Sequence, residues 1–271
     1  MNYQVYTPVA ELQEFVKCFW TLEDQAVPEP IRQRVLPDGC MEMIFHYGDL
    51  YKQYFEDGSF IVQPRSFVFG QITKYLEIAP TGVSGINSAR FLPDGLLPFL
   101  NRPVSELENK AVSLEDLFNE HGKKLEQEVL QAADNQQRIK IIEAFLLSRL
   151  TDPSTIDNIT KDCVSVIIQS RGQVGVVELA GKLKINRRNM ERKFMSVIGM
   201  SPKQLSRVVR LQATLKMLEQ RQFTSLTSLA YENGYYDQAH FIRDFKEFTG
   251  ISPKLFFADN LKLSTLFIAA E

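Results

Sequence analysis

The segment 187–197 carries side chains whose types and spacing suit hydrogen bonding to the edges of nucleic-acid bases. Arg188 and Arg192 are four residues apart, with Glu191 beside them. On a helix these three side chains share one face. An arginine can donate two hydrogen bonds to guanine O6 and N7, and a glutamate can accept one from cytosine N4. The spacing therefore predicts a helix face that reads base pairs.

A second segment, 238–248, has the same character. Gln238, Ala239 and Arg243 occupy positions comparable to those of the first segment. Glutamine can pair with adenine, alanine can contact the thymine methyl group, and arginine can bond guanine or a phosphate. Further side chains beside the two faces are predicted to contact the DNA backbone or to assist the base contacts: Arg187, Lys203, His240 and Lys246.

These segments are the second halves of an internal repeat. Residues 177–202 and 227–253 align with a constant offset of 51 from the turn onward, so that Asn186 falls on Asp237. Before the turn the offset is 50, which gives the second copy one extra turn residue. Each copy is predicted to form two short helices that meet at an angle, a helix-turn-helix unit.

The repeated positions have separate structural roles. Asn186 and Asp237 are expected to cap the N-termini of the two polar helices. Gly199 and Gly250 suit a left-handed C-terminal cap, and the Ser-Pro pair after each glycine opens the next element. If the joining helix holds the units about 34 Å apart, they would enter successive major-groove segments. The predicted elements are units at about 176–197 and 227–248, joined by a helix over 202–218.

Charge is divided unevenly along the chain, whose net charge is −2. Residues 1–154 contain 14 Lys and Arg against 22 Asp and Glu, a balance of −8. Residues 155–254 contain 16 against 9, a balance of +7. A basic module beside an acidic one favours contact of that module with a polyanion. Uneven surface charge of no functional meaning gives the same division, so charge alone leaves both interpretations open.

The repeat extends into a longer pattern of matching positions. They are Leu179-Ala180, Arg192, Phe194, Gly199, Ser201-Pro202, Arg210-Leu211, Ala213, Asn233-Gly234-Tyr235, Asp237, Phe241, Arg243 and Phe245-Lys246. This pattern, which spans about residues 156–256, resembles the DNA-binding domain of the AraC/XylS family of regulators. The resemblance implies a two-lobed domain of seven helices that binds double-stranded DNA. By position it makes Arg188, Glu191 and Arg192, then Gln238, Ala239 and Arg243, the base-facing residues.

The first hundred residues predict a different architecture. Short apolar or alternating runs are separated by turn signals such as Asp57-Gly58, which favours a small β-barrel or sandwich. The runs are 15–23, 40–48, 59–64 and 66–72. Segments 36–45 and 88–96 resemble the cupin-like sensor domains attached to some members of the family. The expected fold class is α+β, with a small N-terminal β-barrel (cupin-like) with helices and an all-α C-terminal domain.

A helical pattern follows, from residue 113 to residue 150. It ends in a wide apolar stripe that includes Ile139, Ile142 and Leu146. The stripe fits a dimerisation helix, which the family resemblance implies, and equally a helix packed on its own barrel. The expected domains are a sensor or dimerisation domain over 1–150, a linker over 151–155 and a DNA-binding domain over 156–271.

A DNA-associated enzyme is the alternative function. It would need a reactive thiol or a metal ion in the N-terminal domain. Glu42 and His46 share a strand face, but metal cupins use several imidazoles and the whole chain has three histidines. Cys18 and Cys40 lie in strand-like apolar runs, which favours buried thiols over reactive ones. We therefore predict no cofactor, no metal site and no catalytic residue, and a regulator in place of an enzyme.

The partners follow from the same resemblance. Double-stranded DNA is the expected partner, with RNA polymerase as an indirect one. A small-molecule effector in the N-terminal domain and a homodimer both stay open. No stretch approaches the roughly 18–20 apolar residues that a membrane span needs, and the N-terminus lacks a secretory signal. The expected compartment is the cytoplasm, with no membrane partner.

Overall fold

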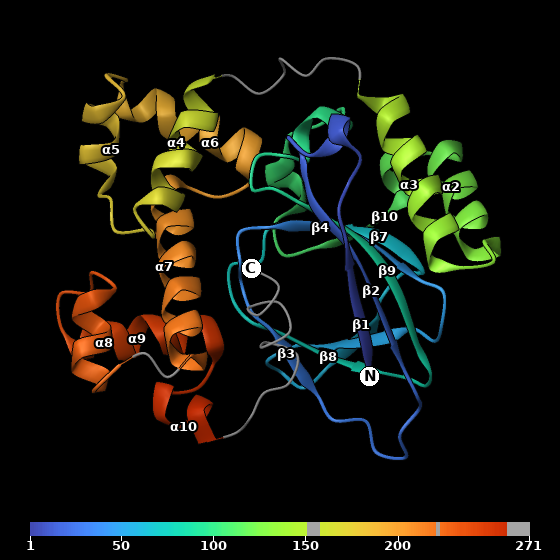
Figure 1. Ribbon diagram of the computed structural model, residues 1–271, viewed down its shortest axis with the longest axis horizontal. Helices are drawn as coiled ribbons and strands as arrows, with labels where there is room; N and C mark the ends of the chain where they lie inside the picture. Colours follow the sequence, from blue (N-terminus) through green and yellow to red (C-terminus); the bar gives the residue numbers. More distant parts are fainter. Residues whose placement is uncertain (151–157, 221–222, 259–271) are drawn as a thin grey trace.

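The computed structural model describes residues 1–150, 158–220 and 223–258. Its first part consists of strands with a few helices, and its second part is helical (Figure 1). The predicted α+β class is confirmed. The linker expected over 151–155 lies outside the described residues.

Two antiparallel sheets form the first part. The six-stranded sheet contains, in spatial order, β1 (Asn2–Tyr6), β2 (Val16–Asp24), β9 (Ser84–Phe91), β4 (Met41–His46), β7 (Ser66–Phe69) and β10 (Ala111–Ser113). The four-stranded sheet contains β3 (Gln33–Val35), β8 (Leu76–Pro80), β5 (Tyr51–Tyr54) and β6 (Phe60–Val62).

Of the two arrangements that the sequence favours, a small β-barrel and a sandwich, the barrel is not formed by the strands that the structure describes. Among the described residues no ladder of paired strands joins the two sheets. The edge strands are short, with three residues each in β3, β6 and β10 and five in β1, and short edge strands disfavour further pairing. The sheets instead form a sandwich-like pair.

Alternation along β4 explains how the large sheet separates two apolar layers. Met41, Met43 and Phe45 are fully buried in a core that also contains residues of the covering helices. Glu42 and His46 lie on the other face of the strand, as the period of two requires, and line a cavity between the sheets. The large sheet therefore has helices on one side and the small sheet on the other.

The helices of the first part follow the strands in sequence. They are α1 (Leu114–Phe118), α2 (Glu120–Gln131) and α3 (Asn135–Arg149), and the short 3₁₀ segments are η1 (Ala10–Leu12), η2 (Leu97–Phe99) and η3 (Val104–Leu107). The stripe of α3 that includes Ile142 and Leu146 is buried in the core of its own domain. The stripe therefore packs on the helix's own domain, which is one of the two alternatives given for it above.

The second part contains, over its described residues, α4 (Asn158–Gln169), α5 (Val176–Lys182), α6 (Arg187–Ile198), α7 (Pro202–Glu219), α8 (Leu226–Glu232), α9 (Gln238–Thr249) and α10 (Pro253–Ala258). Helix α7 runs between two groups, with α5 and α6 near one end and α8 and α9 near the other (Figure 1). Ser201 and Gln204 form a reciprocal capping box at its start, where Pro202 occupies the first turn.

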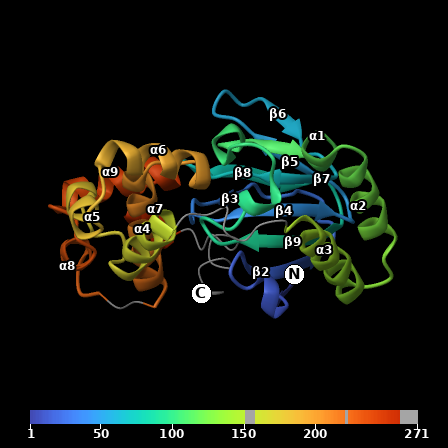
Figure 2. The ribbon, with the colours of Figure 1, turned by 90° about the horizontal axis from the view of Figure 1, so that it is seen from above.

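The two parts of the chain pack directly on each other (Figure 2). Segment η3 contacts the C-terminal end of α6. Arg34 of β3 donates to the carbonyl oxygen of Thr249 at the end of α9 (3.1 Å). Between these contacts, Gln212 of α7 donates to the carbonyl oxygen of Pro37 (2.6 Å). The strand domain thus contacts both helix-turn-helix units and the helix that joins them.

Candidate nucleic-acid interface

Helix α6 is positioned by its two ends and its buried side. The Asn186 side chain accepts from the backbone N–H of Asn189 (3.2 Å), so the predicted N-terminal cap is confirmed. Met190 and Phe194 are buried. Gly199 ends the helix with φ of 80°, a left-handed conformation that favours glycine. With these residues fixed, the opposite side of the helix faces solvent.

The solvent side of α6 carries the side chains predicted to read bases. Arg187, Arg188 and Arg192 are exposed, and Glu191 is half-buried. Arg187 Nε lies 2.9 Å from Glu191 Oε1, and Arg192 donates to Asn189 Oδ1 at 3.0 Å. The Glu191 carboxylate therefore has a partner in this state, and contact with a cytosine would compete with that ion pair. Arg188 has no hydrogen bond or ion pair to any described residue.

Helix α9 repeats this construction. The Asp237 side chain caps it by accepting from the backbone N–H of His240 (2.7 Å). Phe241 and Phe245 are buried, and Gly250 ends the helix with φ of 77°. The turn before α9 is one residue longer than the turn before α6, as the change in repeat offset predicts.

The exposed side of α9 differs in detail from that of α6. Ala239, Arg243 and Lys246 are exposed, whereas Gln238 is half-buried. The Gln238 side-chain oxygen accepts from the hydroxyl of Thr227 (2.9 Å). Pairing of this amide with adenine would need the same oxygen, so the Thr227 contact must be shared or broken.

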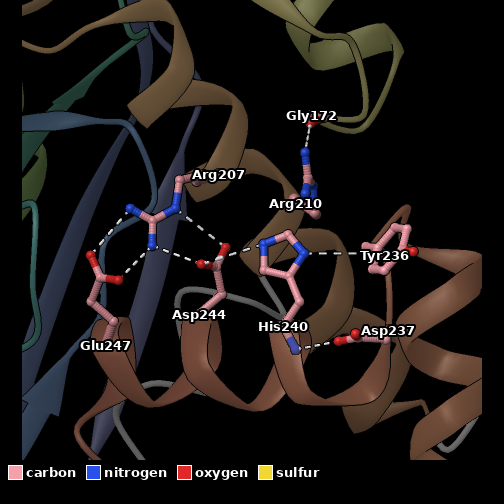
Figure 3. A network of polar contacts seen from close by, with 8 residues as sticks. All are labelled: Gly172, Arg207, Arg210, Tyr236, Asp237, His240, Asp244 and Glu247. Atoms are coloured by element: carbon pink, nitrogen blue, oxygen red, sulfur yellow. Dashed lines mark hydrogen bonds and ion pairs between the residues drawn. The ribbon is translucent and has the colours of Figure 1, made fainter.

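A network of charged side chains ties α9 to α7 (Figure 3). Arg207 donates to both oxygens of Asp244 (2.8 and 3.3 Å) and to both oxygens of Glu247 (3.1 and 2.7 Å). Burial alone would lower the pKa of Arg207, but the hydrogen bonds to Glu247 and Asp244 raise it overall. The guanidinium is therefore permanently charged, and it clamps two successive turns of α9.

His240 belongs to this network and does not point freely outward. Its Nδ1 accepts from the backbone N–H of Tyr236 at 3.4 Å, and its Nε2 lies 3.9 Å from Asp244 Oδ1. The ring packs edge-on against Tyr235. This places His240 at the side of the reading face, next to Arg243 in the groove described next.

A groove between the two units collects some of the predicted residues. Arg187 of α6, Lys203 of α7, and His240 and Arg243 of α9 all line it. The remaining predicted residues lie outside this lining: Arg188, Glu191, Arg192, Gln238, Ala239 and Lys246. The two helices thus share one basic concave surface at their inner edges.

Sequence reasoning assigned no structural role to two arginines on α7. Arg207 forms the clamp just described, and Arg210 donates to the carbonyl oxygen of Gly172 (2.9 Å) and lies over the Tyr235 ring. A signal was present, because Asp244 lies within the apolar stripe of α9. A buried carboxylate needs a charged partner.

The thiols of the strand domain are held in their protonated form. Burial raises the pKa of Cys40 to about 12 and also raises the pKa of Cys18. Because the thiolate is the nucleophile, neither environment favours a reactive cysteine. The described residues contain no group of three or more metal-ligating side chains, and none of the described helices is long and apolar enough to cross a membrane.

Comparison with known protein families gives two matches. Residues 179–259 match a helix-turn-helix domain model, HTH_18. The C-terminal part of the chain is an AraC-type helix-turn-helix domain. Residues 4–113 match a domain of unknown function, DUF6597. The AraC-type domain is thus preceded by a strand domain that matches a different family model.

A curated relative and two solved structures are also similar to the chain. The relative is an uncharacterised HTH-type transcriptional regulator of Haemophilus influenzae, 32% identical over 113 residues, which are 42% of this chain and 36% of the relative. The chain thus matches about a third of that protein's length. ToxT from Vibrio cholerae has 13% identity and a TM-score of 0.48, over 89% of this chain and 98% of ToxT. ToxT with a bound unsaturated fatty acid has 12% identity and a TM-score of 0.45, over 94% of each chain.

Proposed function

We propose that this chain is a sequence-specific transcription regulator that binds double-stranded DNA. Its AraC-type domain would insert α6 and α9 into two successive major-groove segments. The observation that carries the proposal is the pair of capped helices, each with an apolar side in the core and at least one arginine on its exposed side. Helices presented in this way suit major-groove readout.

The proposed roles divide the exposed side chains into two groups. Arg188, Glu191 and Arg192 would read bases from α6, and Gln238, Ala239 and Arg243 would read bases from α9. Arg187, Lys203, His240 and Lys246 would contact the backbone or support the readers. Arg187, Lys203 and His240 of the second group line the groove between the units, which suits a phosphate that crosses it.

The strand domain would serve as the sensor of this regulator. A cavity between its sheets supports a small-molecule effector, and the protonated state of Cys18 and Cys40 disfavours the alternative of a thiol-dependent enzyme. A homodimer and an indirect contact with RNA polymerase are further parts of the proposal, as is action in the cytoplasm.

Selection of bound sequences from a random DNA pool by the purified chain tests the proposal. Fluorescence anisotropy measures the affinity for the selected site. This affinity should fall steeply as the salt concentration rises, because binding releases counterions from several phosphates. Arg192→Ala and Arg243→Ala should weaken binding, whereas Lys140→Ala, an exposed change on α3, should leave it unchanged. Failure to enrich any sequence, or unchanged affinity in both arginine variants, contradicts the proposal.

A further inference from the structure

The space between the two sheets is a cavity of about 80 Å³ with mainly apolar walls. Trp20 and Ile44 contribute from the large sheet, and Tyr51 and Ile78 from the small one. An apolar cavity of about 150 Å³ can hold a benzene ring. This cavity therefore suits a molecule with a branched chain of a few carbon atoms.

Acidic side chains outnumber basic ones at one end of the cavity. Asp38 and Glu42 line it, and no Lys or Arg is among the described residues of the lining. Behind them Arg90, 1% exposed, pairs with Asp38 and places its Nε 3.8 Å from Glu42 Oε1. Two carboxylates thus share one guanidinium. A further negative charge would meet net repulsion in a poorly solvated site.

The Glu42 carboxylate has further capacity to accept hydrogen bonds. Trp20 Nε1 donates to one oxygen (3.2 Å) and the Ser88 hydroxyl approaches the other (3.4 Å). A carboxylate offers about four acceptor sites. Burial raises the pKa of Glu42 to about 7, against the lowering effect of Arg90. A donor entering the cavity would stabilise the ionised form.

His46 provides a second acceptor in the same lining. It is 2% exposed and stacks on the Tyr51 ring. Its Nε2 lies 3.3 Å from the side-chain oxygen of Gln63, which can only accept, so the ring proton belongs on Nε2. Nδ1 is then a bare acceptor, and it has no partner among the described residues. Burial lowers the pKa of His46 to about 4, so the ring is neutral.

The cation nearest to His46 is directed elsewhere. Arg65 donates to the backbone carbonyl oxygens of His46 and Gly48 (2.9 and 2.5 Å). It is not part of the cavity lining. The charged side chains of the lining are therefore acidic, and Glu42 and Nδ1 of His46 offer acceptor capacity to a bound molecule.

We propose that the cavity binds a small apolar molecule with an N–H or O–H donor and no negative charge, an amine or an alcohol, between Glu42 and His46. The inference rests on the proposed function in one respect, namely that the strand domain is the sensor. An amine would pair with Glu42, and an alcohol would donate to Glu42 or to His46. A carboxylic acid of the same size is excluded in its ionised form.

The single tryptophan of the chain, Trp20, lines the cavity and reports on its contents. We would titrate the full chain with isobutylamine, isobutanol and isobutyrate and follow tryptophan emission. Molecules of this size reach dissociation constants of about millimolar. The amine and the alcohol should give saturable changes, and isobutyrate should bind at least about tenfold more weakly. Equal binding of isobutyrate, or no saturable change with any of the three, overturns the proposal.

Two variants locate the site. Glu42→Gln keeps the shape but removes the charge, so the amine should lose about tenfold in affinity while the alcohol is nearly unaffected. Glu128→Gln, an exposed change on α2, is the matched control. Ile78→Phe fills the cavity and should abolish both interactions even if Glu42→Gln unfolds the domain. Retained binding in Ile78→Phe contradicts the location.

DNA binding of the same preparations separates the two proposals. A chain that binds its selected DNA but none of the small molecules contradicts only the cavity assignment. A chain that binds the amine but no DNA contradicts the proposed regulator and leaves the cavity assignment supported.

Discussion

Arg207 on α7 donates two hydrogen bonds to Asp244 on α9, from Nη2 to Oδ1 at 2.8 Å and from Nε to Oδ2 at 3.3 Å. Asp244 is 4% exposed, and a carboxylate buried to this extent needs a charged partner. The pair fixes the rotation of α9 about its own axis. That rotation decides which side chains of α9 face the DNA.

Arg207→Ala should therefore destabilise the domain by about 1–3 kcal/mol, because it leaves a buried carboxylate without its cation. It should also weaken DNA binding, mainly through the bases that α9 reads. Thermal unfolding and anisotropy measure the two effects. The double variant Arg207→Ala, Asp244→Asn removes the stranded charge and should be more stable than Arg207→Ala alone. Equal stability of the two variants would show that the unpaired Asp244 carboxylate carries no cost.

Arg243 and Lys246 are both exposed on α9, which makes them a matched pair for separating base reading from backbone contact. Arg243→Ala should cost about 1–3 kcal/mol of binding free energy and relax the preference at one base position. Lys246→Ala should weaken binding evenly across sequences and reduce the salt dependence. Sequence selection with each variant distinguishes these outcomes. Identical sequence preferences in the two variants would refute the assignment of Arg243 as a reader.

Gly250 has φ of 77°, and a Cβ placed there would lie 2.6 Å from the Tyr75 ring. Gly58 has φ of 83° with open space around it. Gly58→Ala should thus show only backbone strain, about 1 kcal/mol, and Gly250→Ala should cost more because the ring must move as well. Chemical denaturation measures both. Adding Tyr75→Ala to Gly250→Ala should reduce the clash, and an unchanged cost would place the whole effect in the backbone.

Glu42, whose side chain is 17% exposed, predicts a loss of stability as pH rises. Burial raises its pKa to about 7 in the folded chain, above the roughly 4.3 of an unfolded glutamate. The folded state therefore favours the protonated form, and this stabilisation is complete below about pH 4.3 and lost as pH rises through about 7. Relative to Glu42→Gln, the native chain should lose up to about 4 kcal/mol over that window. Chemical denaturation at a series of pH values measures the free energy of unfolding of both proteins. The same pH dependence in the native chain and in Glu42→Gln would contradict the prediction.

The helix ends of the repeat were predictable because their signals are local. Asn186 and Asp237 each cap a backbone N–H three residues ahead, and Gly199 and Gly250 need only a left-handed φ. These preferences act through atoms within one turn, so the chain carries them wherever it folds. Strands β2, β4, β6 and β7 overlap the four predicted runs for a related reason, since apolar runs bounded by turns are short-range features.

The remaining features depend on partners far away in the sequence. Strands β5 and β8 lack a clean alternation, and their pairing with each other creates the small sheet. Arg34 meets Thr249 across 215 residues, and Gln212 meets Pro37 across 175. Such contacts form when helices and strands that have already formed pack together, and no local sequence pattern encodes them. The cavity itself arises between the sheets and has no sequence signature.

The contacts of the strand domain with the far ends of both reading helices have a consequence for operator length. Segment η3 contacts the end of α6, and Arg34 holds the end of α9. One extra base pair between the two half-sites would shift them by about 3.4 Å along the duplex and rotate one past the other by about 35°. The helices cannot follow that change independently while both are attached to the same sheets. Tolerance of altered half-site spacing is therefore a property of the whole chain. It should increase only when the strand domain loses its contact with the end of α6 or of α9.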